Sequence, residues 1–385
     1  MRRFFCALIM TGCLAGCGNS TLSQMAMPDD EISQFSQSGR QPAIALMLKH
    51  YQQKKQVTGM IVAVIRHDGP AEFYAWGVTD ARQGNPVTPQ TLFALGSLSK
   101  GVTAEVIASL VNEGRLHWDD TLVTLLPPGT PLSSDAQKIT LLQLVTHTSG
   151  LPRQPMDLLT MENVARYFAN GENFYQELDN DSVLSWLGSF SAPKARQPQY
   201  SNIGYAILGY ILKYKTHTSI EALATHYIFQ PLQLENTSFN APMLRGYPQR
   251  ALGHAGDQPK FIPRGQLAPD WVFNNNMIAA ASLYSNAGDL IEYARAHFTP
   301  TADRRLNKTL NDVTVSYFER PREAANLAWV SDSAGDSKIT YQVGYIGGYS
   351  SYIGFDKKNK NAVVVLQNSF NWSNYIGQTI LTRLR

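Results

Sequence analysis

Ser97 and Lys100 have the residue types and the spacing of an activated serine nucleophile. They lie in Gly96-Ser97-Leu98-Ser99-Lys100, at the start of a segment whose apolar spacing predicts a helix over 98–113. One helical turn places both side chains on the same face. A serine hydroxyl is a poor nucleophile unless a base takes its proton, and a desolvated lysine amine can be that base. The backbone N–H groups that begin the helix would also stabilise an oxyanion.

A second candidate group, Tyr200-Ser201-Asn202, lies immediately before another expected helix. Residues two apart in an extended segment point to the same side, so Tyr200 and Asn202 can both line one site. A phenol can relay a proton when a nearby cation lowers its pKa. These four side chains are therefore candidates for one catalytic site.

Both motifs occur a second time in the chain. The second Ser-x-x-Lys is Ser191-Ala192-Pro193-Lys194, whose proline breaks the turn that would bring the lysine to the serine. We interpret it as a chance match. In the second Tyr-Ser-Asn, at 284–286, Ser285 has the position expected of a helix cap, so we interpret this copy as structural.

The elements that would position these residues are strands at both ends of the domain and helices in its middle. Strands are expected at 60–65 and 72–76, around the hairpin signal Asp68-Gly69, and at 339–343, 349–355 and 362–366. Helices are expected at 42–55, 98–113, 140–150 (opened by a capping box from Thr140 to Gln143), 203–214, 286–297 and 372–385. Strands joined in sequence by short turns imply an antiparallel sheet. We expect an α/β (α+β) fold, with this sheet flanked by helices and a mostly helical lobe at about 115–320.

Length and composition indicate a globular enzyme-sized domain and exclude some classes of function. The chain has 385 residues, of which 44% are hydrophobic and 16% charged, with a formal net charge of +3. Arg2 and Arg3 contribute two of these charges, and no block of five like charges follows, so we expect no nucleic-acid partner. The sequence contains no HExxH pair and no Cys/His cluster suited to zinc. We therefore expect neither a metal nor an organic cofactor.

The N-terminal segment predicts export from the cytoplasm. The three cysteines, Cys6, Cys13 and Cys17, all lie in this segment, so the folded body has neither a disulfide nor a thiol nucleophile. Two arginines followed by the apolar run 4–14 are typical of a secretory signal peptide.

Leu14-Ala15-Gly16-Cys17 resembles a bacterial lipobox, with a weaker competitor ending at Cys13. It predicts a lipoprotein signal peptide over 1–16, a lipidated Cys17 with a flexible tether over 17–41, and a domain over 42–385. Ordinary secretion with cleavage near 15–17 is the alternative. By resemblance to Gram-negative sorting, Gly18 points to the outer membrane, with the protein facing the periplasm.

In their order along the chain, these motifs resemble those of the serine β-lactamase and penicillin-binding protein family, especially the class C type. The matching segments are Phe93–Lys100, Asn112–Leu116 with Asp119-Asp120, Leu141–Pro152, Tyr200–Gly209, Pro231-Leu232 with Asn236-Thr237, and Ala281–Asp289. The resemblance covers about residues 42–385 and implies a β-lactamase/transpeptidase-like fold. It also implies that His147 has a structural role. The family includes class C β-lactamases, D-Ala-D-Ala carboxypeptidases, D-aminopeptidases and esterases, so the resemblance leaves the substrate open.

The third family motif, Lys-Thr-Gly or His-x-Gly on a strand, is altered. Alignment on Gly347-Gly348-Tyr349 puts Gln342-Val343-Gly344 at its position. Strand alternation sends Gln342 and Gly344 to one face, where Gly344 leaves room for a substrate backbone. The Tyr345 N–H would be the second oxyanion donor beside that of Ser97. Gln342 is neutral, whereas the family's lysine helps to hold a substrate carboxylate.

The resemblance implies acyl transfer through a serine ester. Ser97 would attack a carbonyl, Lys100 and Tyr200 would share the proton transfer, and Asn202 would orient Lys100 and the substrate amide. We expect a monomeric, lipid-anchored hydrolase acting on small-molecule or peptide substrates, peptidoglycan-derived ones included: a β-lactam, a D-amino-acid peptide or an ester. One alternative is a catalytically weak lipoprotein that binds penicillin or peptidoglycan peptides. The other is a structural lipoprotein with a relict site.

Overall fold

The computed structural model describes residues 44–154, 158–175, 178, 180–194, 198–273, 277–320, 323–371 and 375–384. The expected signal peptide, the lipobox with Cys17 and the tether over 17–41 lie outside these residues. Within the described part of the chain, every helix is too short or too polar to cross a membrane.

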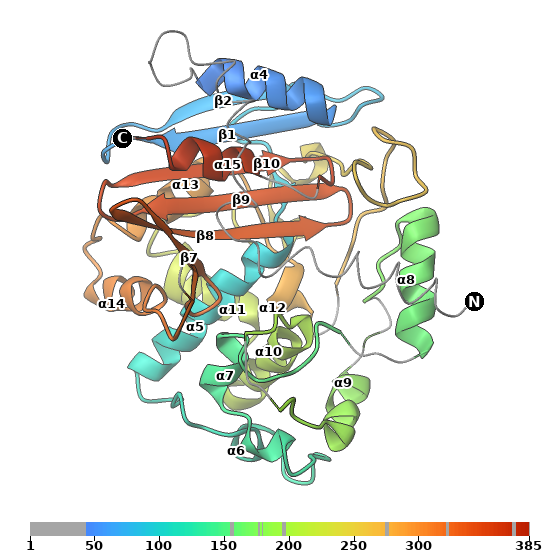
Figure 1. The fold of residues 1–385 in the computed structure, drawn as a ribbon, viewed down its shortest axis with the longest axis vertical. Helices are drawn as coiled ribbons and strands as arrows, with labels where there is room; N and C mark the ends of the chain where they lie inside the picture. Colours follow the sequence, from blue (N-terminus) through green and yellow to red (C-terminus); the bar gives the residue numbers. More distant parts are fainter. Residues whose placement is uncertain are drawn as a thin grey trace.

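An eight-stranded antiparallel sheet occupies one half of the molecule, in the order β2-β1-β10-β9-β8-β7-β6-β5 (Figure 1). The strands are β1 Gly59–Ile65, β2 Glu72–Gly77, β5 Phe318–Arg320, β6 Glu323–Ala325, β7 Val330–Ala334, β8 Ser337–Ile346, β9 Tyr349–Asp356 and β10 Asn361–Gln367; β3 Phe93–Ala94 and β4 Tyr284–Ser285 pair separately. The pairing of β1 with β10 joins the two ends of the domain, as expected. Strands β5 to β7 were not predicted, because their short and polar sequences lack a clear alternation.

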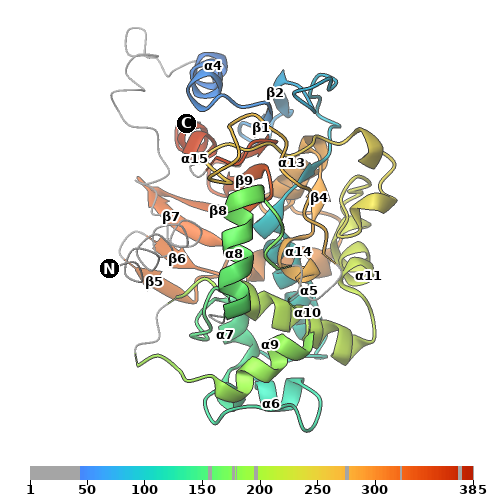
Figure 2. The ribbon, with the colours of Figure 1, turned by 90° about the vertical axis from the view of Figure 1, so that its right-hand side faces the viewer.

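The helices, in chain order, are α4 Ile44–Lys55, α5 Ser99–Asn112, α6 Leu122–Leu125, α7 Leu141–Val145, α8 Leu158–Asn170, α9 Asn180–Trp186, α10 Asn202–Thr216, α11 Ile220–Ala224, α12 Ile278–Ala281, α13 Ala287–Ala296, α14 Arg304–Asp312 and α15 Tyr375–Leu381. Helices cover both faces of the central strands. Val62 and Val64 of β1 pack toward α4 and α15, whereas Ile61 and Ala63 pack in the core that contains α13. Helices α6 and α9 lie at the end of the molecule farthest from α4 (Figure 2).

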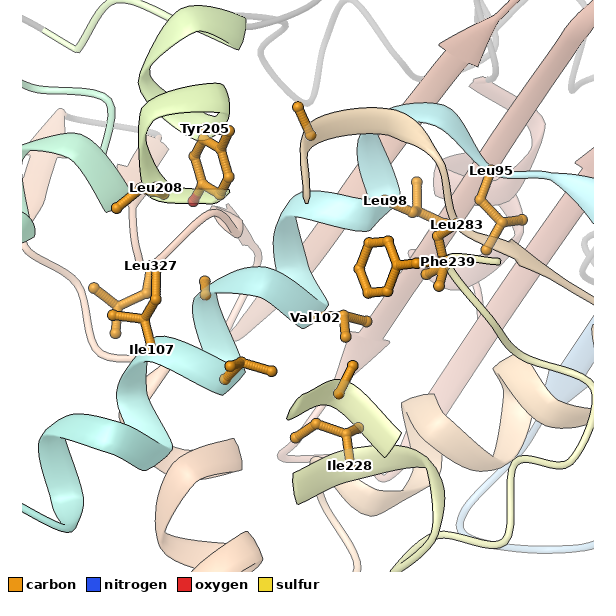
Figure 3. Close-up of a cluster of buried hydrophobic side chains, with 14 of the residues drawn as sticks. Leu95, Leu98, Val102, Ile107, Tyr205, Leu208, Ile228, Phe239, Leu283 and Leu327 are labelled. Atoms are coloured by element: carbon orange, nitrogen blue, oxygen red, sulfur yellow. The ribbon is translucent and has the colours of Figure 1, made fainter. Parts of the chain in front are cut away.

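Helix α5 runs through the middle of the core. Its side chains are buried from Ser99 to Leu110, and Figure 3 shows Val102 and Ile107 among apolar side chains of several other elements. A helix buried on all sides keeps a fixed position. The residues at its N-terminal end are therefore held rigidly against the sheet.

Two details at helix ends differ from expectation. Asn286, and not Ser285, caps α13, since its side chain accepts a hydrogen bond from the Asp289 N–H at 2.8 Å. The capping box of α7 at Thr140 is confirmed, but the helix ends at Val145 and not at Gly150. It ends early because His147 takes a left-handed conformation with φ of 59°. The boundaries of a helical lobe at about 115–320 stay a prediction.

Candidate active site

Ser97 lies in a short 3₁₀ turn, Gly96–Leu98, that leads directly into α5. Its Oγ is 3.1 Å from the Nζ of Lys100 and 2.6 Å from the hydroxyl oxygen of Tyr200. The three side chains come from the start of α5 and from the segment before α10. The structure thus brings together the two motifs that the sequence singled out.

Lys100 is almost fully buried, and its surroundings compensate for the loss of water. Its Nζ donates to the carbonyl oxygen of Ala280 at 2.9 Å. The same nitrogen lies 5.0 Å from the ring centroid of Tyr200 and 5.7 Å from that of Tyr205. A carbonyl oxygen and two aromatic faces stabilise a positive charge in this position.

Tyr200 is placed by the cap of α10. The N-cap residue is Ser201, whose Oγ accepts from the Gly204 N–H at 2.9 Å and donates to the Pro152 carbonyl at 2.7 Å. Because the helix begins only at Asn202, Tyr200 lies outside it on extended chain, with its hydroxyl on Ser97. The side chain of Asn202 donates to the hydroxyl of Tyr175 at 2.5 Å. Its expected role in orienting Lys100 stays a prediction.

Tyr175 and Gln154 join the site without having been predicted. The Tyr175 hydroxyl donates to Gln154 Oε1 at 3.3 Å, which extends the hydrogen-bonded chain from Asn202. Gln154 directly follows Leu151-Pro152-Arg153 at the end of a family-like segment, and this position could have drawn attention to it. Tyr175 has no such signal, since it lies in a loop that only the fold brings to α10.

His147 supports the site as a neutral residue. Its Nδ1 accepts from the Ser201 N–H at 3.1 Å, and its ring lies 4.6 Å from that of Tyr200. Burial, followed by the positive charges of Lys100 and Arg153, lowers the pKa of His147 to about 3. The residue therefore acts as an uncharged hydrogen-bond acceptor, which agrees with the structural role expected for it.

Strand β8 approaches Ser97 through glycines. A Cβ at Gly344 would overlap the carbonyl oxygen of Leu95, and a Cβ at Gly96 would lie 2.9 Å from the Tyr345 carbonyl oxygen. In the described part of the sheet, the pairing of β7 with β8 ends at Tyr341. From Gln342 to Ile346, strand β8 therefore forms an edge of the sheet, and this edge lies beside the Ser97 turn. The close approach supports the alignment of Gly344 with the glycine of the third motif.

Gln342 is buried on the same face of β8 as Gly344, and Val343 packs on the opposite face with the α4 core, so the expected alternation is confirmed. The Gln342 side chain is engaged, since its Nε2 donates to the Ala328 carbonyl at 3.2 Å. Its amide also packs on α5, where a Cβ at Gly101 would lie 2.7 Å from Nε2. The residue at the position of the family's lysine is thus a neutral amide that is bound to the backbone of Ala328. Among the described residues, no cluster of His, Cys, Asp and Glu side chains could hold a metal ion.

Comparison with known proteins agrees with this geometry. The β-lactamase family model matches residues 44–383. A β-lactamase of Yersinia enterocolitica is 25% identical over 354 residues, covering 82% of this chain and 83% of that protein. The D-alanyl-D-alanine-carboxypeptidase/endopeptidase AmpH of Escherichia coli K12 is 26% identical over 334 residues, covering 81% of this chain and 80% of that protein.

Solved structures show the same fold. A class C β-lactamase from Rhodobacter sphaeroides has a TM-score of 0.73 at 22% identity, covering 89% of this chain and 97% of that chain. An octameric penicillin-binding protein homologue from Pyrococcus abyssi has a TM-score of 0.74 at 23% identity, covering 89% of this chain and 76% of that chain. With the matched family model and the arrangement around Ser97, the chain belongs to the β-lactamase family of serine hydrolases.

Proposed function

We propose that this protein hydrolyses amide or ester substrates through an acyl-enzyme on Ser97, the substrate being a β-lactam, a D-amino-acid peptide or an ester. The observation that supports this most is the position of Ser97 Oγ, within hydrogen-bond distance of both Lys100 Nζ and the Tyr200 hydroxyl. Relatives named as β-lactamase and as D-alanyl-D-alanine-carboxypeptidase agree with such chemistry.

In the proposed reaction, Ser97 Oγ attacks the carbonyl carbon while its proton passes to Lys100 as the neutral amine or to Tyr200 as the phenolate, both groups being in hydrogen-bond contact with Oγ. The oxyanion that forms accepts hydrogen bonds from the backbone N–H groups of Ser97 and Tyr345. One such donor is worth about a hundred- to a thousandfold in kcat. The leaving nitrogen or oxygen then takes the proton back, and a water molecule releases the acyl group from Ser97. Asn202 orients Lys100 and the substrate amide.

A second candidate function is acylation with little turnover, that is, a penicillin- or peptidoglycan-peptide-binding protein. Gln342 favours it, because a neutral amide bound to the Ala328 carbonyl replaces a charged group of the family. Losing a charge-assisted hydrogen bond to the substrate costs about 1.5–3 kcal/mol.

Covalent labelling tests the proposed nucleophile. We expect the purified protein to react with a fluorescent penicillin or a fluorophosphonate, and Ser97→Ala to remove the label while the fold is kept. Ser191→Ala is the matched control, since Ser191 belongs to the second Ser-x-x-Lys, and it should label like the wild type. Equal labelling of wild type and Ser97→Ala would exclude Ser97. Hydrolysis of a chromogenic cephalosporin and a p-nitrophenyl ester then separates turnover from the second candidate, which labels but does not turn over.

We further propose that the protein is a monomer anchored through a lipid on Cys17 to the outer membrane, facing the periplasm. The lipobox-like sequence ending at Cys17 supports this. Cys17→Ser should move the protein to the soluble periplasmic fraction and block incorporation of a palmitate analogue. Persistent lipid labelling of this variant would point to Cys13.

A further inference from the structure

A second cation, Arg153, lies beside the candidate nucleophile. Its guanidinium carbon is 5.1 Å from the ring centroid of Tyr200, and the hydroxyl of that ring is 2.6 Å from Ser97 Oγ. A guanidinium over a phenol face is held there by the negative potential of the ring. Tyr200 therefore has positive groups from two elements around it, Lys100 from α5 and Arg153 from the segment after α7.

The backbone around Arg153 is tied to the start of α10. The Arg153 carbonyl accepts from the Asn202 N–H at 3.0 Å, and the preceding carbonyl, of Pro152, accepts from the Ser201 hydroxyl at 2.7 Å. On the other side, Gln154 Oε1 accepts from the Tyr175 hydroxyl at 3.3 Å. The backbone at Pro152 and Arg153 is thus tied directly to Ser201 and Asn202, and Gln154 is linked to Asn202 through Tyr175. The backbone position of Arg153 follows from the same contacts that build the site.

The charge distribution of the site makes Arg153 important. The third-motif position holds the neutral Gln342, whose amide is bound to Ala328. His147, under Tyr200, is uncharged because burial and the nearby Lys100 and Arg153 lower its pKa to about 3. Lys100 is buried against the Ala280 carbonyl and Ser97. Arg153 is only partly buried, and its guanidinium lies on the Tyr200 ring beside Ser97.

We propose that Arg153 binds the carboxylate of the substrate and so replaces the cation that Gln342 lacks. The planar guanidinium can donate two parallel hydrogen bonds to a carboxylate, which gives it a specificity that a neutral amide does not have. The inference rests on the proposed acyl transfer and narrows its substrates to those with a free carboxylate near the reacting carbonyl. Penicillins and peptides ending in a D-amino acid have such a group, whereas simple esters do not.

A matched pair of substrates tests this role. The first is an N-acylglycine aryl ester with a carboxylate on the leaving group, and the second is the same compound with that carboxylate methylated. We expect Arg153→Gln to lower kcat/KM about ten- to a hundredfold on the first substrate. On the second substrate, the factor by which kcat/KM falls should be at least ten times smaller. Arg153→Lys should lie between wild type and Arg153→Gln. Arg305→Gln, which removes an exposed arginine of α14, is the control and should change neither value.

A double variant tests the exchange of charges. In the Arg153→Gln background, Gln342→Lys should restore the preference for the free carboxylate. Equal losses on both substrates, or no loss on either, would overturn the proposal. Suppose that the wild type turns over the methylated ester and that Arg153→Gln leaves the preference for the free carboxylate over this ester unchanged. The role of Arg153 is then wrong, whereas the proposed acyl transfer stands. If the wild type neither turns over nor labels on Ser97, the proposed function itself fails.

Discussion

The tripeptide Tyr-Ser-Asn occurs twice in this chain and folds in two ways. At 200–202 the serine caps helix α10, so the tyrosine lies directly outside the helix and reaches Ser97. At 284–286 the asparagine caps α13, and the tyrosine and serine form strand β4, which pairs with β3. A shift of the cap by one residue thus separates a candidate catalytic tyrosine from a structural one.

The surroundings of the two phenols differ as well. Burial, followed by the negative charge of Asp270, raises the pKa of Tyr284, so this hydroxyl keeps its proton. Tyr200 is only partly buried and lies against the positive groups of Lys100 and Arg153. Positive charge near a phenol stabilises its anion, whereas an apolar environment disfavours it. We therefore expect the environment, and not the motif, to decide which of the two phenols can transfer a proton.

The largest expected contrast is between Tyr200→Phe and Tyr284→Phe. Loss of the Tyr200 hydroxyl removes a proton-transfer group, so kcat/KM on a p-nitrophenyl ester should fall about a hundred- to ten-thousandfold. Tyr284→Phe should leave kcat/KM within about threefold of the wild type, because its ring lies in the core. Steady-state kinetics on both variants, with thermal melts to confirm folding, give the answer. Similar losses in the two variants would contradict the distinction between the copies.

A second contrast is a pH dependence of stability that comes from His147, the acceptor for the Ser201 N–H. Its pKa of about 3 in the folded state is below the usual value of 6.5, so on acidification the unfolded state takes up the proton first. The contribution of His147 to stability should therefore be constant above about pH 7 and fall as the pH decreases from 6.5 toward 3. Each unit of pKa difference is worth about 1.4 kcal/mol, so the total is a few kcal/mol.

The test uses His147→Asn, since asparagine tolerates the left-handed conformation and can accept the same hydrogen bond. Urea unfolding at pH 7.5, 5.5 and 4.5 should show a smaller loss of stability for this variant than for the wild type. His217→Asn is the matched control, because His217 has a φ of 55° and is exposed. If His147→Asn loses as much unfolding free energy between pH 7.5 and pH 4.5 as the wild type does, His147 is not the cause of that loss.

The smallest expected effects come from the two helix caps. Ser201→Ala and Asn286→Ala each remove a side-chain acceptor at a helix N-terminus and should each cost about 1 kcal/mol of unfolding free energy. Only Ser201→Ala should also lower kcat/KM, by several-fold, because the Ser201 hydroxyl ties Tyr200 and its neighbours to Pro152. Equal activities in the two variants would mean that the cap of α10 does not position Tyr200.

Local patterns predicted much of the fold. The helix over α5, the capping box of α7, the first hairpin and the three C-terminal strands follow from periodicity and turn chemistry, which act over a few residues. Strands β5 to β7 could not be predicted from such patterns, since short polar strands are stabilised by their neighbours in the sheet and not by their own sequence pattern. The cap of α13 was misassigned because serine and asparagine are equally good caps, and sequence alone does not rank them.

For the site, the sequence by itself determined the candidates Ser97, Lys100, Tyr200 and Asn202, because a helical turn and an extended tripeptide set their local geometry. Only the tertiary structure decided that Tyr200 meets Ser97, that Gln342 turns to the Ala328 carbonyl, and that Arg153 lies on the Tyr200 ring. These contacts join residues far apart in the chain. Their distances and charges depend on how α5, α10 and β8 pack together, and no spacing in the sequence encodes that packing.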